Sequence, residues 1–172
     1  NNADCNDNDS AISAGALERC NNVDDDCDGL VDEGCDDDDD GYCDSQMQTI
    51  GTPTTCANGG GDCLDTNATV YPGKTAEICD GLDDDCNGSA DNGCDDDQDG
   101  YCDAAMTTVL PAPSSCPMGG GDCNDQNNSR NPGATEVCGN SADDNCNGSQ
   151  NDVNATGCKP FYYDDDGDTF GL

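Results

Sequence analysis

The chain has 172 residues, and 39 acidic against 4 basic side chains give it a formal net charge of −35. This charge excludes nucleic acid as a partner, because the phosphate backbone would be repelled, and it should hold a metal-free chain open. Tryptophan is absent, aromatic residues are 4 %, and the hydrophobic 32 % includes all 16 cysteines, so little is left to build a core. We therefore expect disulfides and bound ions to organise the fold.

The cysteines also indicate the compartment. Their number is even, histidine is absent and no Cys-x-x-Cys motif occurs, which favours disulfides over zinc sites or a cytosolic redox enzyme. No apolar stretch is long enough to cross a membrane. We expect an extracellular or cell-surface protein, and a chain that begins at Asn1 without a signal-like run should be a processed or partial product.

An internal repeat organises the sequence. Cys20, Cys79 and Cys138 recur with a period of 59 residues, which predicts three copies: 1–60, 61–120 and a divergent, incomplete 121–172. Each copy opens with the motif Gly-Asp-Cys-x-Asp, followed by Pro-Gly-x-x-x-Glu-x-Cys. Two aspartate ladders, segments with an acidic residue at every second position, come next, and a Thr/Pro-rich arm ends the copy. No segment has a sustained helical or strand period, so we expect a tandem array that consists mostly of loops and turns, with little regular secondary structure.

The first acidic residues of each copy form a candidate third metal site per repeat. In the second copy Asp62 and Asp65 lie beside a cysteine, and Glu77 can fold back across the Pro72-Gly73 turn. The alternative is that these carboxylates cap short helices. The equivalent residues in the other two copies are Asp4, Asp7, Glu18 and Asp122, Asp125, Glu136.

The ladders carry the strongest signal. Carboxylates at alternate positions with glycine at the sixth, as in Asp24-x-Asp26-x-Asp28-Gly29, are typical of loops that wrap a calcium ion. The alternative, a solvated acidic run, does not explain the repeated glycine. Position twelve holds Cys35 or Met47 in place of the EF-hand glutamate, so these loops are not EF-hands. The predicted ligands are Asp24, Asp26, Asp28, Asp32, Asp36, Asp38, Asp40, Asp44, Asp83, Asp85, Asn87, Asp91, Asp95, Asp97, Asp99 and Asp103.

The third copy departs from this pattern. Its first ladder contains Asp143, Asn145 and Asn147, and its second ladder has Thr169 where glycine is expected after Asp164, Asp166 and Asp168. We expect weaker sites there. Counting ladders and third sites, about two to three Ca²⁺ per repeat are predicted.

Two disulfide schemes remain open. The third copy has no cysteine that matches Cys43 or Cys102, and it ends before the equivalents of Cys56 and Cys116. This joint absence favours Cys43–Cys56 and Cys102–Cys116. The rival scheme pairs sequence neighbours: Cys20–Cys27, Cys35–Cys43 and Cys56–Cys63.

Six Asn-x-Ser/Thr sequons occur. Asn87 and Asn147 occupy a ligand position, so we favour metal ligation there, and the candidate N-linked glycan sites are Asn67, Asn127 and Asn154. The Thr/Pro-rich arms 49–55 and 107–115 should be extended or pair as brief strands.

The chain resembles the MopE-type metal-binding repeat of secreted bacterial proteins. The resemblance rests on Gly121-Asp122-Cys123-Asn124-Asp125, Pro132 to Cys138, Asp143 to Gly148 and Tyr162 to Asp168, and it covers nearly the whole chain. The tandem ladders are also similar to thrombospondin type 3 repeats, in which calcium replaces a hydrophobic core. The family name implies copper, but copper favours imidazole or thioether ligands, and this chain has no histidine and only three methionines.

These observations favour a structural role. We expect no enzyme, because the chain has little with which to build an apolar pocket that shifts carboxylate pKa values. The predicted function is a calcium-stabilised extracellular subunit of a cell-surface or matrix filament, and head-to-tail association is expected because both ends fall inside a repeat. The alternative is a calcium-dependent adhesion module that binds a glycan or a cell-surface partner.

Overall fold

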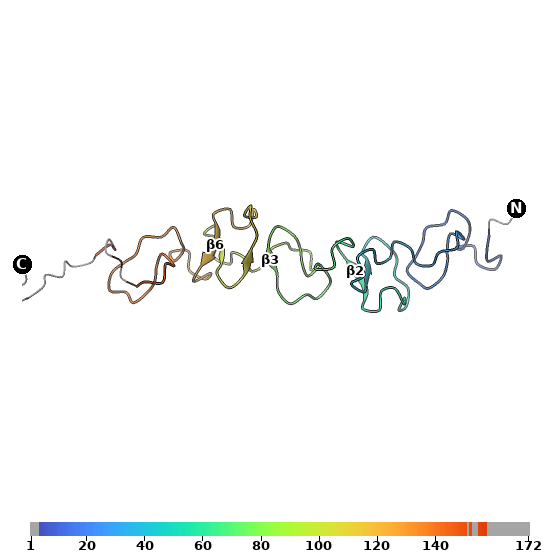
Figure 1. The fold of residues 1–172 in the computed structure, drawn as a ribbon, viewed down its shortest axis with the longest axis horizontal. Helices are drawn as coiled ribbons and strands as arrows, with labels where there is room; N and C mark the ends of the chain where they lie inside the picture. Colours follow the sequence, from blue (N-terminus) through green and yellow to red (C-terminus); the bar gives the residue numbers. More distant parts are fainter. Residues whose placement is uncertain (1–3, 151, 153–154, 158–172) are drawn as a thin grey trace, which may run out of the picture. The chain divides into compact units, whose positions relative to one another are not determined.

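A computed structural model describes residues 4–150, 152 and 155–157. The backbone consists of turns, bends and loops with six short strands and no helix in this part of the chain (Figure 1). The expected disulfide-rich, loop-dominated fold is confirmed. Accordingly, none of the described segments is a helix long and apolar enough to span a membrane. The chain forms two compact units, 1–92 and 93–172.

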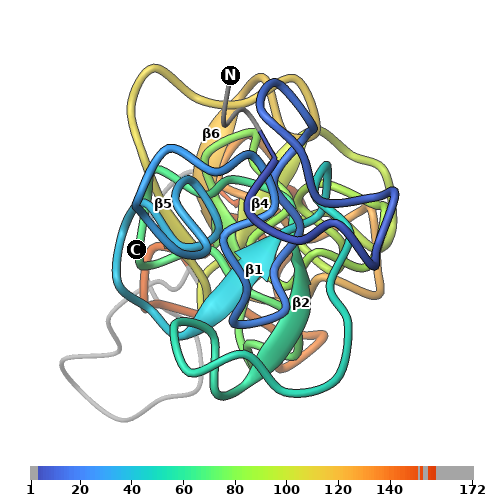
Figure 2. The same ribbon diagram turned by 90° about the vertical axis from the view of Figure 1, so that its right-hand side faces the viewer.

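The first unit contains strands β1 (Tyr42–Asp44), β2 (Gly59–Asp62) and β3 (Ile78–Cys79). β1 and β2 are parallel and lie side by side (Figure 2), with Tyr42 opposite Gly59 and a bulge before Asp44 reaches Asp62. Gly60 is required here, because a Cβ atom at this position would lie 2.3 Å from Oγ1 of Thr49. Thr49 itself forms a parallel bridge with Cys20, so this arm makes the brief pairing expected for it.

The second unit repeats this arrangement with β4 (Tyr101–Asp103) and β6 (Gly119–Asp122), and it contains β5 (Thr107–Thr108). β4 and β6 pair in parallel, and the bulge again brings Asp103 opposite Asp122. In both units the strand pair joins the end of a second ladder to the motif that opens the next sequence copy. The boundary between the two units, at residues 92 and 93, therefore differs from the predicted copy boundaries after residues 60 and 120, and the copy boundaries remain a prediction.

Disulfides take the place of an apolar core. Cys43–Cys56 and Cys102–Cys116 form as predicted, whereas the neighbour scheme is wrong because Cys20 pairs with Cys35. Three further bonds attach the opening motif to the first ladder in every copy: Cys5–Cys27, Cys63–Cys86 and Cys123–Cys146. In the first unit the buried cluster consists of Cys20, Cys35, Cys43 and Cys56, with Met47 packed against it.

Candidate metal centres

Five ladders share one loop conformation, held by their own side chains. The first residue of each ladder accepts the position-five amide at 3.0–3.2 Å and the position-six amide at 2.7–3.0 Å. Position three accepts the position-five amide, and position five accepts the position-seven amide. The odd positions therefore face the inside of the loop. These loops begin at Asp24, Asp36, Asp83, Asp95 and Asp143.

Glycine at position six follows from this geometry. Gly29 has φ of 98° and Gly41 has φ of 89°, in the region that side chains with a Cβ rarely adopt. Its amide must also approach the first carboxylate closely. The turn expected at this position is confirmed.

The glutamate of the Glu-x-Cys motif completes the first ladder. Glu18 Oε1 accepts the amides of Asp25 and Asp26 at 2.7 and 2.9 Å. Ligand oxygens of Glu18, Asp24 and Asp26 lie within 4.8 Å of one another, close enough to bind one ion together. Glu18 therefore belongs to the ladder centre and not to a separate third site.

The same arrangement recurs in the other copies. Glu77 accepts the amides of Asp84 and Asp85, and Glu136 accepts those of Asp144 and Asn145. Burial raises the pKa of Glu77, and the nearby charges of Asp85 and Asp84 add to this effect.

Residue ten of the first ladder is a participant that the sequence reasoning missed. Its own backbone amide lowers the pKa of Glu33, but burial and the charges of Glu18, Asp28 and Asp26 raise it overall. Glu33 therefore lies near the same carboxylates. The available signal was an acid or amide at this position in each copy: Glu33, Asn92 and Asp152.

In the third copy, asparagine side chains take the place of carboxylates at positions three and five of the first ladder. Asn145 and Asn147 both donate through Nδ2 to Asp152 Oδ2, and these side-chain hydrogen bonds lower the pKa of Asp152. The amides therefore donate to a carboxylate whose counterpart in the first copy, Glu33, has a buried Oε2 without a hydrogen-bond partner. The weaker metal site expected for the third copy stays a prediction.

Position two of the first ladder, also missed, has a structural role. Asp25, Asp84 and Asp144 are at most 7 % exposed and pair with Arg19, Lys74 and Arg130 respectively. Hydrogen bonds and the charge of Arg19 lower the pKa of Asp25. These are the three basic side chains in the described part of the chain, so the loop-facing carboxylates have no protein cation.

Position nine of the first ladder has a different environment from the predicted one. Asp32 Oδ1 accepts the amides of Asn21 and Asn22 at 2.7 and 2.8 Å, and Asp91 Oδ1 accepts those of Asp80 and Gly81 at 2.9 and 2.8 Å. The reason is that the preceding Glu-x-Cys turn presents free amides to these side chains. Both residues therefore cap this turn, and their predicted role as metal ligands stays a prediction.

The predicted third site is divided between two places. Glu77 lies at the first ladder of its own copy, whereas Asp65 accepts the amide of Asp37 from the preceding second ladder at 3.2 Å. Asp125 does the same with Asp96 at 3.1 Å. Asp4 and Asp7 are exposed, and the second ladder of the third copy, Asp164, Asp166 and Asp168, lies outside the described residues.

Buried carboxylate oxygens without a hydrogen-bond partner mark these centres. In the described part of the chain, every buried side-chain oxygen or nitrogen without such a partner is a carboxylate oxygen. Leaving a buried charged group unsatisfied costs about 1–3 kcal/mol or more. The oxygens belong to Glu18, Glu33, Asp38, Asp40, Asp62, Asp97, Asp122 and Glu136. Hard oxygen donors of this kind fit a cation, and Asp and Glu carboxylates are the preferred ligands of calcium.

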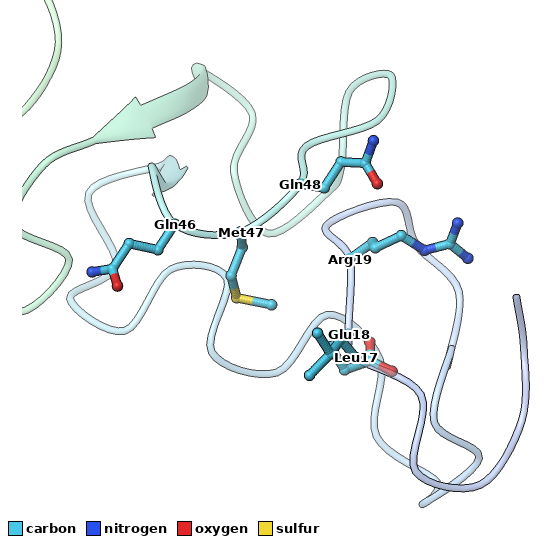
Figure 3. A pocket seen from close by; sticks show the side chains of 6 residues that line it. All are labelled: Leu17, Glu18, Arg19, Gln46, Met47 and Gln48. Carbon is cyan, nitrogen blue, oxygen red and sulfur yellow. The ribbon is translucent and has the colours of Figure 1, made fainter.

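A pocket of about 490 Å³ adjoins the first centre without belonging to it. Met47 extends towards the side of the pocket where Leu17 and Glu18 lie, and the chain contributes the basic group of Arg19 nearby (Figure 3). Leu17 is 88 % exposed. The pocket is lined by a single carboxylate, so it is a surface hollow and not a cation site.

Together, the loops and their unsatisfied carboxylates define a disulfide-rich tandem repeat protein with metal-binding motifs. The family model Cu-binding MopE, "Putative metal-binding motif", matches residues 4–33, 62–92 and 122–152, more than half of the chain. The chain belongs to this family. No curated protein and no solved structure matches it.

The donor set does not fit the copper of the family name. Each matched segment contains the opening motif, the glutamate and the first ladder, which supply carboxylate and amide oxygens. Histidine is absent, and the cysteine sulfurs in the described part of the chain form disulfides. Copper prefers imidazole and sulfur ligands, so the residues present favour a harder cation.

Proposed function

We propose that the chain is a calcium-stabilised extracellular structural repeat protein. One observation carries this proposal: buried carboxylate oxygens without hydrogen-bond partners recur from copy to copy. They belong to the ladders, whose sequence is typical of calcium-binding loops, or to acidic residues of the adjoining motifs. The many disulfides support an oxidising, extracellular location.

Calcium acts as a folding ligand in this proposal. An ion that binds only the folded chain stabilises it by RT ln(1 + [L]/Kd) per site, and several sites add. With few apolar side chains buried besides cysteines, and with a net charge of −35, the carboxylates need this neutralisation.

The test is removal of calcium from the disulfide-intact protein. Chelation should lower the melting temperature, expose new protease sites and change the far-UV spectrum, and added Ca²⁺ should reverse all three. Copper and Mg²⁺ at equal concentration serve as controls. An unchanged melt and protease pattern after chelation would show that the metal is incidental.

The structural role extends to self-association into a filament, which tandem repetition favours. Electron micrographs of purified protein with Ca²⁺ should show long uniform filaments that shorten or disappear after chelation. The intact mass of denatured, reduced material tests the subunit: a species near 17.6 kDa plus modifications supports assembly from this chain. A much larger polypeptide would contradict assembly from separate chains and would indicate one long chain with many repeats.

A second candidate is a calcium-dependent adhesion module for a glycan or cell-surface partner. The hollow beside exposed Leu17 favours it. Retention of monomers on a glycan or partner column, lost on chelation and in Leu17→Asp, would support this candidate. Release of N-linked glycans from Asn67 and Asn127 would test the two candidate glycan sites within the described part of the chain, whereas Asn154 lies outside it.

A further inference from the structure

The second ladder of one copy lies against the opening motif of the next. β1 brings Asp44 opposite Asp62 of β2, and Ser45 donates its amide to the Asp62 carbonyl at 2.7 Å. One turn further, the Asp37 amide donates to Asp65 Oδ1 at 3.2 Å. These contacts cross the predicted repeat boundary at residue 60.

The carboxylates at this junction have oxygens without partners. Asp62 is 0 % exposed, and its Oδ1 accepts the Leu64 amide while its Oδ2 is buried and has no hydrogen-bond partner. The ladder contributes two more such oxygens, Oδ2 of Asp38 and of Asp40. Burial raises the pKa of Asp62, and the charges of Asp40, Asp38 and Asp44 raise it further, as expected for carboxylates that lie near Asp62.

The second unit shows the same arrangement independently. Asp122 is 0 % exposed with a buried, unpartnered Oδ2, and Asp97 supplies the ladder oxygen. Asp103 lies opposite Asp122, and Ala104 donates to the Asp122 carbonyl at 2.7 Å. One difference is that Asp99 Oδ2 accepts Nδ2 of Asn131 at 2.7 Å, so this junction keeps fewer free oxygens.

We infer that Asp62 and the preceding second ladder, through Asp38 and Asp40, bind one divalent cation jointly, so that the ion fastens consecutive repeats. The inference rests on the proposed calcium function, and it adds ligands that the family match does not cover, because the match ends at residue 33 and resumes at Asp62, so the second ladder lies between two matched segments. Together with Cys43–Cys56, the ion closes the segment between one ladder and the next copy. The second junction, at Asp97 and Asp122, binds an ion in the same way.

The test is a double-mutant cycle on calcium stoichiometry. Asp38→Ala and Asp62→Ala are made singly and together, Asp37→Ala at the exposed neighbouring position is the matched control, and bound Ca²⁺ is counted by native mass spectrometry of disulfide-intact protein. Each single variant should lose one ion, and the double variant should lose the same one ion. The control should lose none. A double variant that loses two ions overturns the joint site and leaves the calcium proposal intact.

Two further measurements distinguish ligand loss from loss of the turn. Asp62→Asn keeps an oxygen to accept the Leu64 amide but removes the charge, and it should weaken the junction ion at least tenfold while the other ions remain. Hydrogen exchange at Gly59–Asp62 should increase in this variant and not in Glu18→Ala, which affects only the first-ladder centre. Unchanged affinity in Asp62→Asn overturns the inference, whereas a wild-type chain that binds no calcium overturns it together with the proposed function.

Discussion

Substitutions of two adjacent residues in one ladder should destabilise the protein in different ways. Asp84 is 1 % exposed and accepts Lys74 Nζ and the Ile78 amide, both at 2.7 Å, whereas Asp85 faces the loop and accepts the Asn87 amide. Asp84→Ala therefore breaks a buried ion pair, and Asp85→Ala removes a proposed calcium ligand. The two variants differ by one sequence position and should be distinguishable by how their stability depends on calcium.

The magnitudes follow from burial and linkage. Breaking a buried pair costs about 3–5 kcal/mol, and the side chain of Lys74 is 15 % exposed, so we expect about 3 kcal/mol for Asp84→Ala. For a unit of this size, this corresponds to a fall in melting temperature of roughly 12–24 °C. Each ion bound on folding adds about 1.4 kcal/mol of stability per tenfold rise in calcium above its Kd. The stability of Asp85→Ala should therefore rise by about 1.4 kcal/mol less than that of wild type for each tenfold rise in calcium concentration.

The assay is thermal or urea unfolding of disulfide-intact protein across several decades of calcium concentration. Asp84→Ala should give a line parallel to wild type and displaced downwards at every concentration. Asp85→Ala should approach wild type at low calcium and diverge from it as calcium rises. A reduced slope in Asp84→Ala with an unchanged slope in Asp85→Ala would show that the ligand register is reversed.

Three further outcomes are expected. Asp97→Ala should lower calcium affinity and stability more than Asp37→Ala, because Asp97 has a buried free oxygen and Asp37 is exposed; equal effects in calcium titrations would contradict this. Gly60→Ala should cost about 1–3 kcal/mol in urea unfolding, because its Cβ would lie 2.3 Å from Thr49 Oγ1, and Thr49→Ala should restore part of the loss. Burial, and the charges of Asp37, Asp44 and Asp62, raise the pKa of Asp65 to about 6, so the contribution of Asp65 to the stability of the metal-free protein should be full below about pH 4 and be lost as the pH rises through 6. A metal-free melting temperature that rises from pH 4.5 to pH 7 would refute that sign.

Local chemistry made the ladders predictable from sequence. The alternation of carboxylates with glycine specifies a loop in which Asp24 and Asp26 turn inwards, because each accepts amides only a few residues away. The pairing Cys43–Cys56 was also predictable, since both equivalents are missing together from the third copy.

Contacts between distant segments were decided only by the tertiary structure. The sequence grouped Asp62 with Glu77, but β1–β2 pairing carries Asp62 to the preceding ladder and the Pro72-Gly73 turn returns Glu77 to its own. Likewise, nothing local distinguishes Asp25 from Asp37, both at position two of a ladder. Only the fold places Arg19 against Asp25 and leaves Asp37 in solvent, because in a chain with so few cations the position of each one determines which carboxylate is neutralised by the protein and which needs an ion.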